Sequence, residues 1–217
     1  MLNPDSDLRP KNEDIILGSA FISDPMKRAD ILCLHAFLER LQDLPLRTKS
    51  ELMAEIRLKW WHEAMDEIEA THNVRYHPLT EAIQRLCQHY GLKPQDFKSL
   101  IEAQAQLIGH EATSKAQALD YIDKTSLIIA RLSAHILSPQ YGTEHLVEPI
   151  RLYGLAQLGF DIEAHIRPAQ AAMRHIPTSL MPVVAHTGLA LAKSQQKPLS
   201  PLAKRLKLLG TYILGWI

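Results

Sequence analysis

One uninterrupted helical pattern constrains the fold more than any other feature of this sequence. From Thr48 to Glu69 the chain contains no glycine or proline, and apolar residues recur at steps of three and four. This spacing places them on one face of a helix: Met53, Ile56, Trp60, Ala64 and Ile68, widened by Trp61 and Met65. Thr48 and Glu51 have the spacing of a capping box. We expect a core helix here, whose adjacent tryptophans point about 100° apart.

The same spacing predicts helices along most of the chain. Asp24-Pro25 and Ser200-Pro201 each combine a capping residue with a proline at the first helical position. We expect the first of these helices to end near Pro45. The other expected helices cover residues 78–90, 94–108, 118–137, 143–173 and 179–194, and a last helix begins at 201. Gly91 is expected to end the first of these, and a break is expected at Gly159 or Pro168 within 143–173. The last helix has Leu202, Leu206, Leu209 and Ile213 on one face.

The pattern contains no comparable strand signal. The chain has only nine glycines and few runs rich in valine, isoleucine or threonine. About eight helices with short connections predict an all-α fold, a single-domain helical bundle over residues 23–217. Residues 1–22 are expected to be a mobile lead-in with a helical turn at 14–20.

Composition narrows the function classes. Lysine plus arginine equals aspartate plus glutamate, 24 each, so there is no global signal for nucleic acid. Cys33 and Cys87 lack metal-ligand spacing, and two buried thiols in a reduced, cytoplasmic compartment are expected. The N-terminus is polar and acidic, which does not resemble a signal peptide. The uncharged run 178–192 is too short to span a membrane.

Several phrases resemble the squalene/phytoene synthase family. They are residues 21–30 with Leu34-His35-Ala36-Phe37, the phrase Glu-Ile-Arg-Leu-Lys-Trp-Trp at 55–61, and residues 77–79 and 120–122. The tryptophan phrase resembles a hallmark of bacterial members and of the mitochondrial complex I assembly-factor branch. Together the matches cover most of residues 20–182. The resemblance implies the all-α bundle of isoprenoid-synthase type.

The resemblance also implies where catalytic carboxylates should lie. Family enzymes join two prenyl diphosphates head to head with Mg²⁺ ions held by two aspartate-rich helices, because Mg²⁺ prefers hard oxygen ligands. At the first motif, the three aspartate positions are occupied by Gln42, Asp43 and Leu46, and Glu39 lies one turn before Asp43. We expect Pro45 to end the helix inside this motif.

The second motif is also incomplete. Gly154-Leu155-Ala156-Gln157-Leu158 resembles its entry, but the expected acidic positions hold Ala164, Arg167 and Pro168. Asp161 and Glu163 are acidic but two residues apart, which on a helix turns them to different faces. A basic residue in a metal cage would repel the ion.

Three interpretations remain open. The lead is a non-catalytic family member, either an assembly or scaffold factor or a binder of an apolar, isoprenoid-like ligand. The alternative is an atypical Mg²⁺-dependent prenyltransferase acting on farnesyl or geranylgeranyl diphosphate in isoprenoid biosynthesis, with metal ligands Glu39, Asp43, Asp161 and Glu163. The third is a bundle whose resemblance is accidental. The small number of well-placed carboxylates in the two motifs favours the non-catalytic interpretation.

Binding candidates follow from the resemblance and from charge. Arg57, Trp60, Trp61 and Arg174 are candidates for ligand or anion binding, although Arg57 with Lys59 is equally explained as solvated charge. Partners to expect are an isoprenoid or other apolar ligand, a respiratory-complex or other protein, and no nucleic acid. Lys204, Arg205 and Lys207 precede an apolar end, residues 208–217, with Trp216. This pattern fits peripheral contact with the inner face of a membrane, or a last helix docked on the core.

Overall fold

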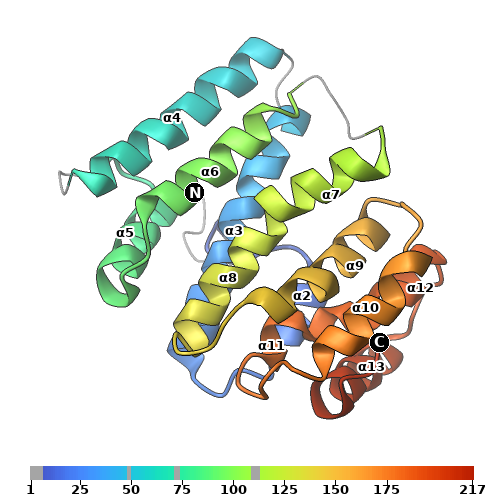
Figure 1. The fold of residues 1–217 in the computed structure, drawn as a ribbon. Helices are drawn as coiled ribbons and strands as arrows, with labels where there is room; N and C mark the ends of the chain where they lie inside the picture. Colours follow the sequence, from blue (N-terminus) through green and yellow to red (C-terminus); the bar gives the residue numbers. More distant parts are fainter. Residues whose placement is uncertain (1–6, 48–49, 71–73, 109–112) are drawn as a thin grey trace. The chain divides into compact units, whose positions relative to one another are not determined.

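The structure, a computed structural model, describes residues 7–47, 50–70, 74–108 and 113–217 (Figure 1). Within these residues every regular element is a helix, so the predicted all-α class is confirmed. The chain divides into two compact units, and each is described by itself. Unit 1 combines residues 1–11 with 29–112, and unit 2 combines residues 12–28 with 113–217. None of the helices in the described ranges has the length and apolar composition needed to cross a bilayer.

Unit 1 is built from four helices around an aromatic core. They are α3 (Pro25–Arg47), of which the part from Ala29 belongs to this unit, α4 (Glu51–Glu69), α5 (Pro78–Tyr90) and α6 (Pro94–Ala105). Phe37 of α3 lies edge-on to Trp61 of α4 and to Phe97 of α6, with ring centroids 5.3 and 5.8 Å apart. Because edge-on aromatic pairs are favourable and all three rings are buried, this cluster ties α3, α4 and α6 together.

The helix starts follow local rules, but one predicted helix end is wrong. Asp24 caps α3, its carboxylate accepting from the backbone N–H of Met26 and of Lys27. Gly91 ends α5 in the left-handed conformation, as expected. However, α3 continues past Pro45 to Arg47. A proline this close to a helix end removes one backbone hydrogen bond, which the rest of a long helix can tolerate.

The buried face of α4 differs from the predicted stripe. The expected cap Thr48 lies outside the described residues, and Ser50 caps the helix by accepting from the Met53 N–H. Met53 and Ile56 are exposed, at 45% and 52%. The buried residues are Ala54, Leu58, Trp61, Ala64, Met65 and Ile68. Periodicity predicted a helix correctly, but apolar residues on several sides left its inward face ambiguous.

Unit 2 surrounds one central helix. Its elements are α2 (Glu13–Ser19), α7 (Lys115–Lys124), α8 (Ser126–Leu137), η1 (Glu144–Leu146), α9 (Val147–Gln157), α10 (Glu163–Met173), α11 (Met181–Val184), η2 (Ala185–Leu189), α12 (Ala190–Ser194) and α13 (Pro201–Leu214). Helix α9 packs against α7, α8, α10, α12 and η2. At Gly154 a side chain would lie 2.7 Å from Ile122, so glycine allows α7 and α9 to approach closely.

Three expected helices of unit 2 are divided. The 118–137 helix is α7 and α8, separated at Thr125. The expected helix 143–173 is interrupted at Gly159, one of its two predicted break positions: α9 ends at Gln157, and Gly159 turns the chain with a φ of +79°. The other position, Pro168, lies inside α10. The 179–194 helix is three short segments. Glycine explains the second break, because a positive φ costs it little.

The expected lead-in contributes to unit 2. The predicted helical turn at 14–20 is present as α2, whose cap is the Asn12 side chain. Asp14, Ile15 and Ile22 are buried. This helix packs against η2, α11 and α13, so residues 13–19 belong to the core of the unit.

Helix α13 is docked on η2 at very short range. Ser200 caps it as predicted, accepting from the Ala203 N–H. Thr211 faces inward, and a Cβ at Gly188 would lie 1.9 Å from the Thr211 hydroxyl oxygen. Phe21 stacks on Tyr212 with ring centroids 4.6 Å apart. The inner face of α13 is therefore fixed by close packing.

This packing predicts opposite effects for two glycine substitutions. Gly188→Ala should lower the free energy of unfolding by about 1 to 3 kcal/mol, because the threonine is too short to move aside. Gly210→Ala, in the same helix as Thr211 but with no atom within 4 Å of the added Cβ, should raise it by about 0.5 to 1 kcal/mol. Urea unfolding followed by circular dichroism measures both. Equal effects of the two substitutions would contradict the close contact.

Candidate functional site

The two tryptophans of α4 have different surroundings. Trp61 is 4% exposed and lies edge-on to Phe37 and to His77, with a centroid distance of 5.0 Å to the latter. Trp60 is half-buried and lies edge-on to Trp61 at 5.0 Å. Trp61 is thus a core residue of unit 1, and Trp60 covers it from outside.

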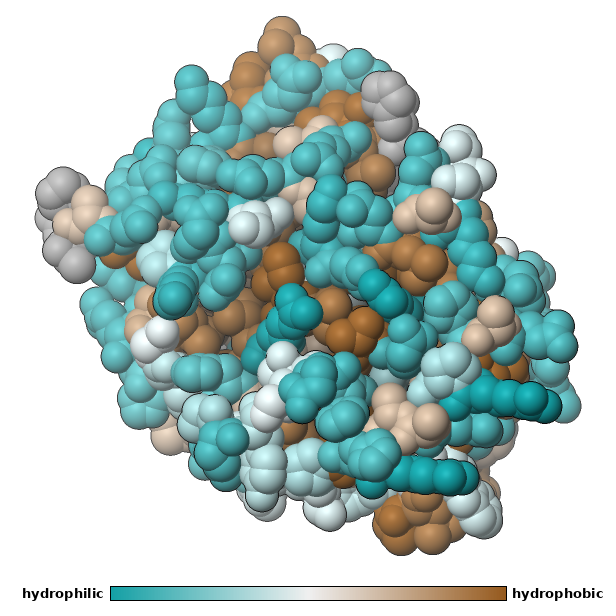
Figure 2. Space-filling view, viewed as in Figure 1, coloured by the Kyte–Doolittle hydropathy of each residue, from teal (hydrophilic) through white to brown (hydrophobic). Residues whose placement is uncertain are grey.

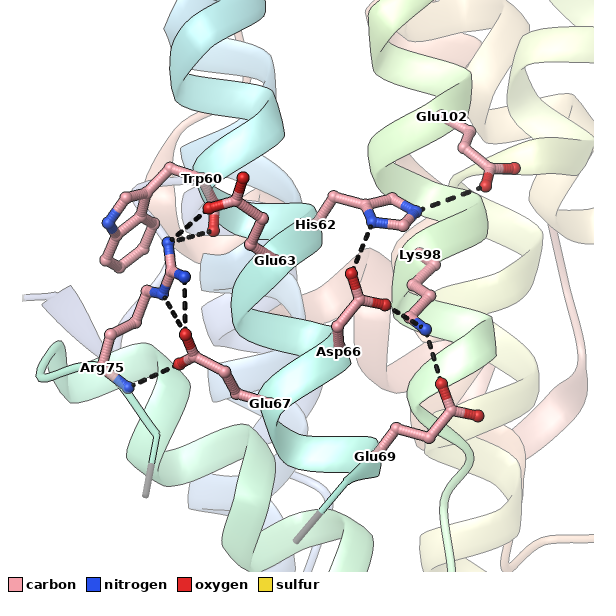
Figure 3. Close-up of polar contacts among 9 residues, drawn as sticks. All are labelled: Trp60, His62, Glu63, Asp66, Glu67, Glu69, Arg75, Lys98 and Glu102. Atoms are coloured by element: carbon pink, nitrogen blue, oxygen red, sulfur yellow. Dashed lines mark hydrogen bonds and ion pairs between the residues drawn. The ribbon is translucent and has the colours of Figure 1, made fainter. Parts of the chain in front are cut away.

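Arg75 holds the outer side of α4 (Figure 3). Its guanidinium donates to Glu67 Oε1 from Nε and Nη2, at 3.0 and 2.6 Å, and to Glu63 Oε2 from Nη1 at 3.1 Å. It also lies 5.2 Å from the centroid of a Trp60 ring, at cation–π distance. The carboxylate of Glu67 is the main reason that the pKa of Arg75 is raised, against the effect of burial. Its charge is therefore already balanced within the chain.

A second network joins α4 to α6 (Figure 3). Lys98 of α6 is buried, and its ammonium donates to Asp66 at 2.6 Å and to Glu69 at 2.5 Å. His62 lies 3.3 Å from Asp66 and 3.8 Å from Glu102. A buried ammonium needs such partners to remain charged. These acids serve the packing of α4 on α6.

The predicted anion candidates Arg57 and Arg174 lie in different units. Arg57 is exposed on α4, and Arg174 is exposed at the end of α10. Neither makes an ion pair with any residue in the described part of the chain. Each remains a candidate for a surface anion contact.

The carboxylates of the first motif position converge on a lysine. Glu39 and Asp43 lie one turn apart on α3. The backbone N–H of Lys11 donates to Glu39 Oε2, and the Lys11 ammonium donates to Asp43 Oδ2, both at 2.6 Å. The Lys11 ammonium thus contacts Asp43, the one acid that stands at an expected aspartate position of the first motif.

The second acidic pair does not converge. Asp161 lies two residues before the start of α10, and its Oδ1 accepts a hydrogen bond from the Glu163 N–H at 3.2 Å. The other oxygen lies 3.5 Å from the Lys115 ammonium. Both acids are exposed, as are Ala164 and Arg167 at two of the expected acidic positions. Asp161 is therefore held by a local backbone contact and a lysine, apart from any other acid of the motif.

Unit 2 contains a buried polar cluster that the sequence did not indicate. Tyr153 donates to Asp14 at 2.9 Å, and the ammonium groups of Lys193 and Lys204 each lie 3.3 Å from the same carboxylate. Burial opposes ionisation of Asp14, but the tyrosine and the two lysines outweigh it and hold its pKa below the ordinary value. His186 is buried edge-on to Tyr153 at 4.5 Å.

Unit 1 has a comparable buried acid. Asp30 is 1% exposed and accepts from Arg85 at 2.6 Å and from Tyr90 at 2.8 Å. Cys33, one turn away, is buried as expected, and burial raises the pKa of its thiol to about 12. Cys87 is only half-buried, and burial raises the pKa of its thiol to about 11. Neither thiol is reactive at neutral pH.

The side chains that could hold a metal ion are dispersed over the described residues. Among them, no three histidine, cysteine, aspartate or glutamate side chains are grouped to hold an ion. The four acids that the resemblance implies belong in pairs to different units, and one acid of each pair, Asp43 and Asp161, lies beside a lysine ammonium. A Mg²⁺ ion at Asp43 would have to displace the ammonium of Lys11.

The Arg75 network predicts a measurable contribution to stability. Arg75→Ala should lower the free energy of unfolding by about 1 to 2 kcal/mol, because it removes a forked, partly buried ion pair and leaves two carboxylates close together. Arg57→Ala, an exposed arginine of α4, is the matched control and should change it by less than about 0.5 kcal/mol. Thermal unfolding of the two variants measures this difference. Equal destabilisation by Arg75→Ala and Arg57→Ala would contradict a special role for Arg75.

The burial of His186 leads to a prediction of how the free energy of unfolding depends on pH. Burial lowers the pKa of His186 to about 4, with Lys193 acting in the same direction and Asp14 opposing it. Between pH 6.5 and 4 the unfolded chain binds a proton here that the folded chain does not. Unfolding free energy should therefore fall by about 3 kcal/mol as pH decreases through this window.

The variant His186→Gln should lack this contribution, while His89→Gln, an exposed histidine, should keep it. Urea unfolding at pH 7, 5.5 and 4 measures the difference. Parallel pH dependence of the native chain and His186→Gln would contradict the assignment.

Comparison with known proteins agrees with the helical fold and with the tryptophan phrase. The profile of squalene/phytoene synthases matches residues 8–193, most of the chain. A search among curated proteins finds no match. The family match extends across both units and includes the positions of both acidic motifs. This chain belongs to the squalene/phytoene synthase family.

Proposed function

We propose that this chain is a non-catalytic member of its family, acting as an assembly or scaffold factor or as a binder of an apolar, isoprenoid-like ligand. The observation that carries the proposal is the contact of Lys11 with both Glu39 and Asp43. The ammonium beside Asp43 repels a metal ion, and the two hydrogen bonds from Lys11 engage one oxygen of each carboxylate.

The number of available carboxylates supports the same conclusion. A diphosphate is ionised by several Mg²⁺ ions, each of which is held by one or two carboxylates together with phosphate oxygens. At the second motif, Asp161 accepts from the Glu163 N–H and lies 3.5 Å from the Lys115 ammonium, and Arg167 stands where an acid is expected. Two well-placed acids are too few for this chemistry.

The assembly form of the proposal is supported by the tryptophan phrase, which resembles a hallmark of bacterial members and of the mitochondrial complex I assembly-factor branch. In unit 1 this phrase forms part of the core, with Trp61 buried and Trp60 held under Arg75. The phrase therefore supports the fold of the unit and requires no catalytic use. A protein that keeps the family fold without the metal-binding carboxylates is suited to binding a protein partner or an apolar ligand.

One observation favours the alternative of an atypical prenyltransferase. Glu39 and Asp43 lie one turn apart and reach the same residue, Lys11. If Lys11 moved away, the two acids would be close enough to share one Mg²⁺ ion. This alternative makes a different prediction for turnover.

A diphosphate-release assay separates the two functions. The full chain is incubated with Mg²⁺ and farnesyl or geranylgeranyl diphosphate. We expect no release above the protein-free background. Mg²⁺-dependent release that Asp43→Asn abolishes, and that Glu102→Gln on α6 leaves unchanged, would contradict the proposal.

Binding is tested separately by thermal unfolding with farnesol, which has the isoprenoid chain but no diphosphate. A ligand-binding role predicts a rise in melting temperature that grows with farnesol concentration. No shift up to the solubility limit would exclude the ligand-binding form of the proposal and leave the assembly form.

A further inference from the structure

Helix α13 has an apolar stripe that faces away from its own unit. Leu208 and Thr211 are each 1% exposed and form the buried side of the helix. The other apolar residues are exposed: Leu202 67%, Leu206 59%, Leu209 41%, Ile213 65% and Leu214 54%. An ordinary docked helix would bury these residues and expose its polar ones. Here the apolar side is the outer side.

Helical geometry shows that the stripe is continuous. At about 100° per residue, Leu202, Leu206, Leu209 and Ile213 fall within about 60° of one another. Leu208 and Thr211 lie on the opposite side of the helix. In Figure 2, hydrophobic side chains gather at the lower edge of the view, over the position of α13 in Figure 1, with strongly hydrophilic side chains beside them.

Two exposed cations of α13 lie outside the stripe, Arg205 beside it and Lys207 farther round the helix. At the same angular step, Arg205 lies about 60° from Leu202 on one side, and Lys207 about 140° on the other. Both are exposed, and neither forms an ion pair within the described residues. Lys204, in contrast, faces inward and contacts Glu13 at 2.5 Å. The apolar stripe of α13 thus has one cation, Arg205, at its margin, while Lys207 lies nearer the buried side of the helix, although the whole chain has no net charge.

The end of the helix adds an aromatic side chain to this face. Gly215 terminates α13 in the left-handed conformation, and the Thr211 hydroxyl donates to the carbonyl of Trp216 at 2.6 Å. The Trp216 backbone is therefore fixed to the buried side of α13, while its side chain is 69% exposed. Tryptophan is favoured where one part of a side chain is in an apolar phase and another in water.

We propose that the outer face of α13 binds the surface of a bilayer that contains anionic phospholipid. The helix would lie in the plane of the interface with its stripe among the acyl chains, while Arg205 and Lys207 reach the headgroup phosphates. The charge pattern supports this occupant over a second copy of the chain, since two identical faces would bring their cations together. The inner face needs no rearrangement, because Thr211 and Leu208 remain packed in unit 2.

Co-sedimentation of the full chain with vesicles tests the proposal. Vesicles of phosphatidylcholine with 30% phosphatidylglycerol are compared with vesicles of phosphatidylcholine alone, at low and high salt. We expect binding to the anionic vesicles, with weaker binding in high salt because exposed charges are screened.

Two double variants locate the surface. Leu206→Gln with Ile213→Gln should reduce the partition coefficient at least tenfold, because it removes the centre of the stripe. Arg205→Gln with Lys207→Gln should reduce it about tenfold on anionic vesicles only. All four side chains are exposed, so unchanged circular dichroism and melting temperature are expected and verify folding.

The matched control is Leu52→Gln with Ile56→Gln on α4, where the two side chains are exposed at 64% and 52%. This control should bind like the native chain. The proposal fails if the native chain does not sediment with anionic vesicles, or if the α13 stripe variant binds as well as the control. A dimer that dissociates on substitution of the stripe, without vesicle binding, would assign the face to a second copy instead.

Discussion

Pairing of carboxylates with the chain's own cations is the constraint on which this structure depends. A carboxylate removed from water is costly unless a cation or several donors compensate it. The pairs run through both units: Asp30 with Arg85, Asp14 with Lys193 and Lys204, Asp123 with Arg151, and Asp43 with Lys11. A diphosphate-handling site needs carboxylates that remain free for metal ions. In this member of the family, Asp43 of the first motif is also in contact with a cation, and Glu39 accepts from the backbone N–H of the same lysine.

The second constraint is that a helix must present its apolar surface to something. Most helices satisfy it within their own unit, as α4 does through Trp61 and Met65. Helix α13 does not, because its close contact with Gly188 turns Thr211 inward and the leucine stripe outward. Tight docking through one face and an apolar opposite face together make α13 a surface for binding rather than part of a core. Loss of catalysis and gain of a binding face would be compatible in one protein, because they involve different helices.

Much of the fold could be predicted because it is determined locally. The caps Asp24 and Ser200 and the terminating Gly91 act on adjacent backbone, so sequence spacing suffices to find them. The inward face of α4 was harder to predict than its helical structure, because the helix has apolar residues on several sides. Only tertiary packing determines that Leu58 rather than Ile56 is buried. The site depends on distant contacts: Lys11 is 32 residues from Asp43, and no local pattern indicates that they meet. The departures from the family's acidic motifs are a matter of residue identity and are visible in the sequence, but their effect on metal binding stays a prediction.

Magnesium binding tests the central claim most directly. In isothermal titration calorimetry of the full chain with Mg²⁺ and inorganic diphosphate, occupation of Glu39 and Asp43 by Lys11 predicts no saturable heat beyond that of mixing Mg²⁺ with diphosphate alone. Saturable binding that is lost in Asp43→Asn would show that these acids remain available to metal, and would contradict the account.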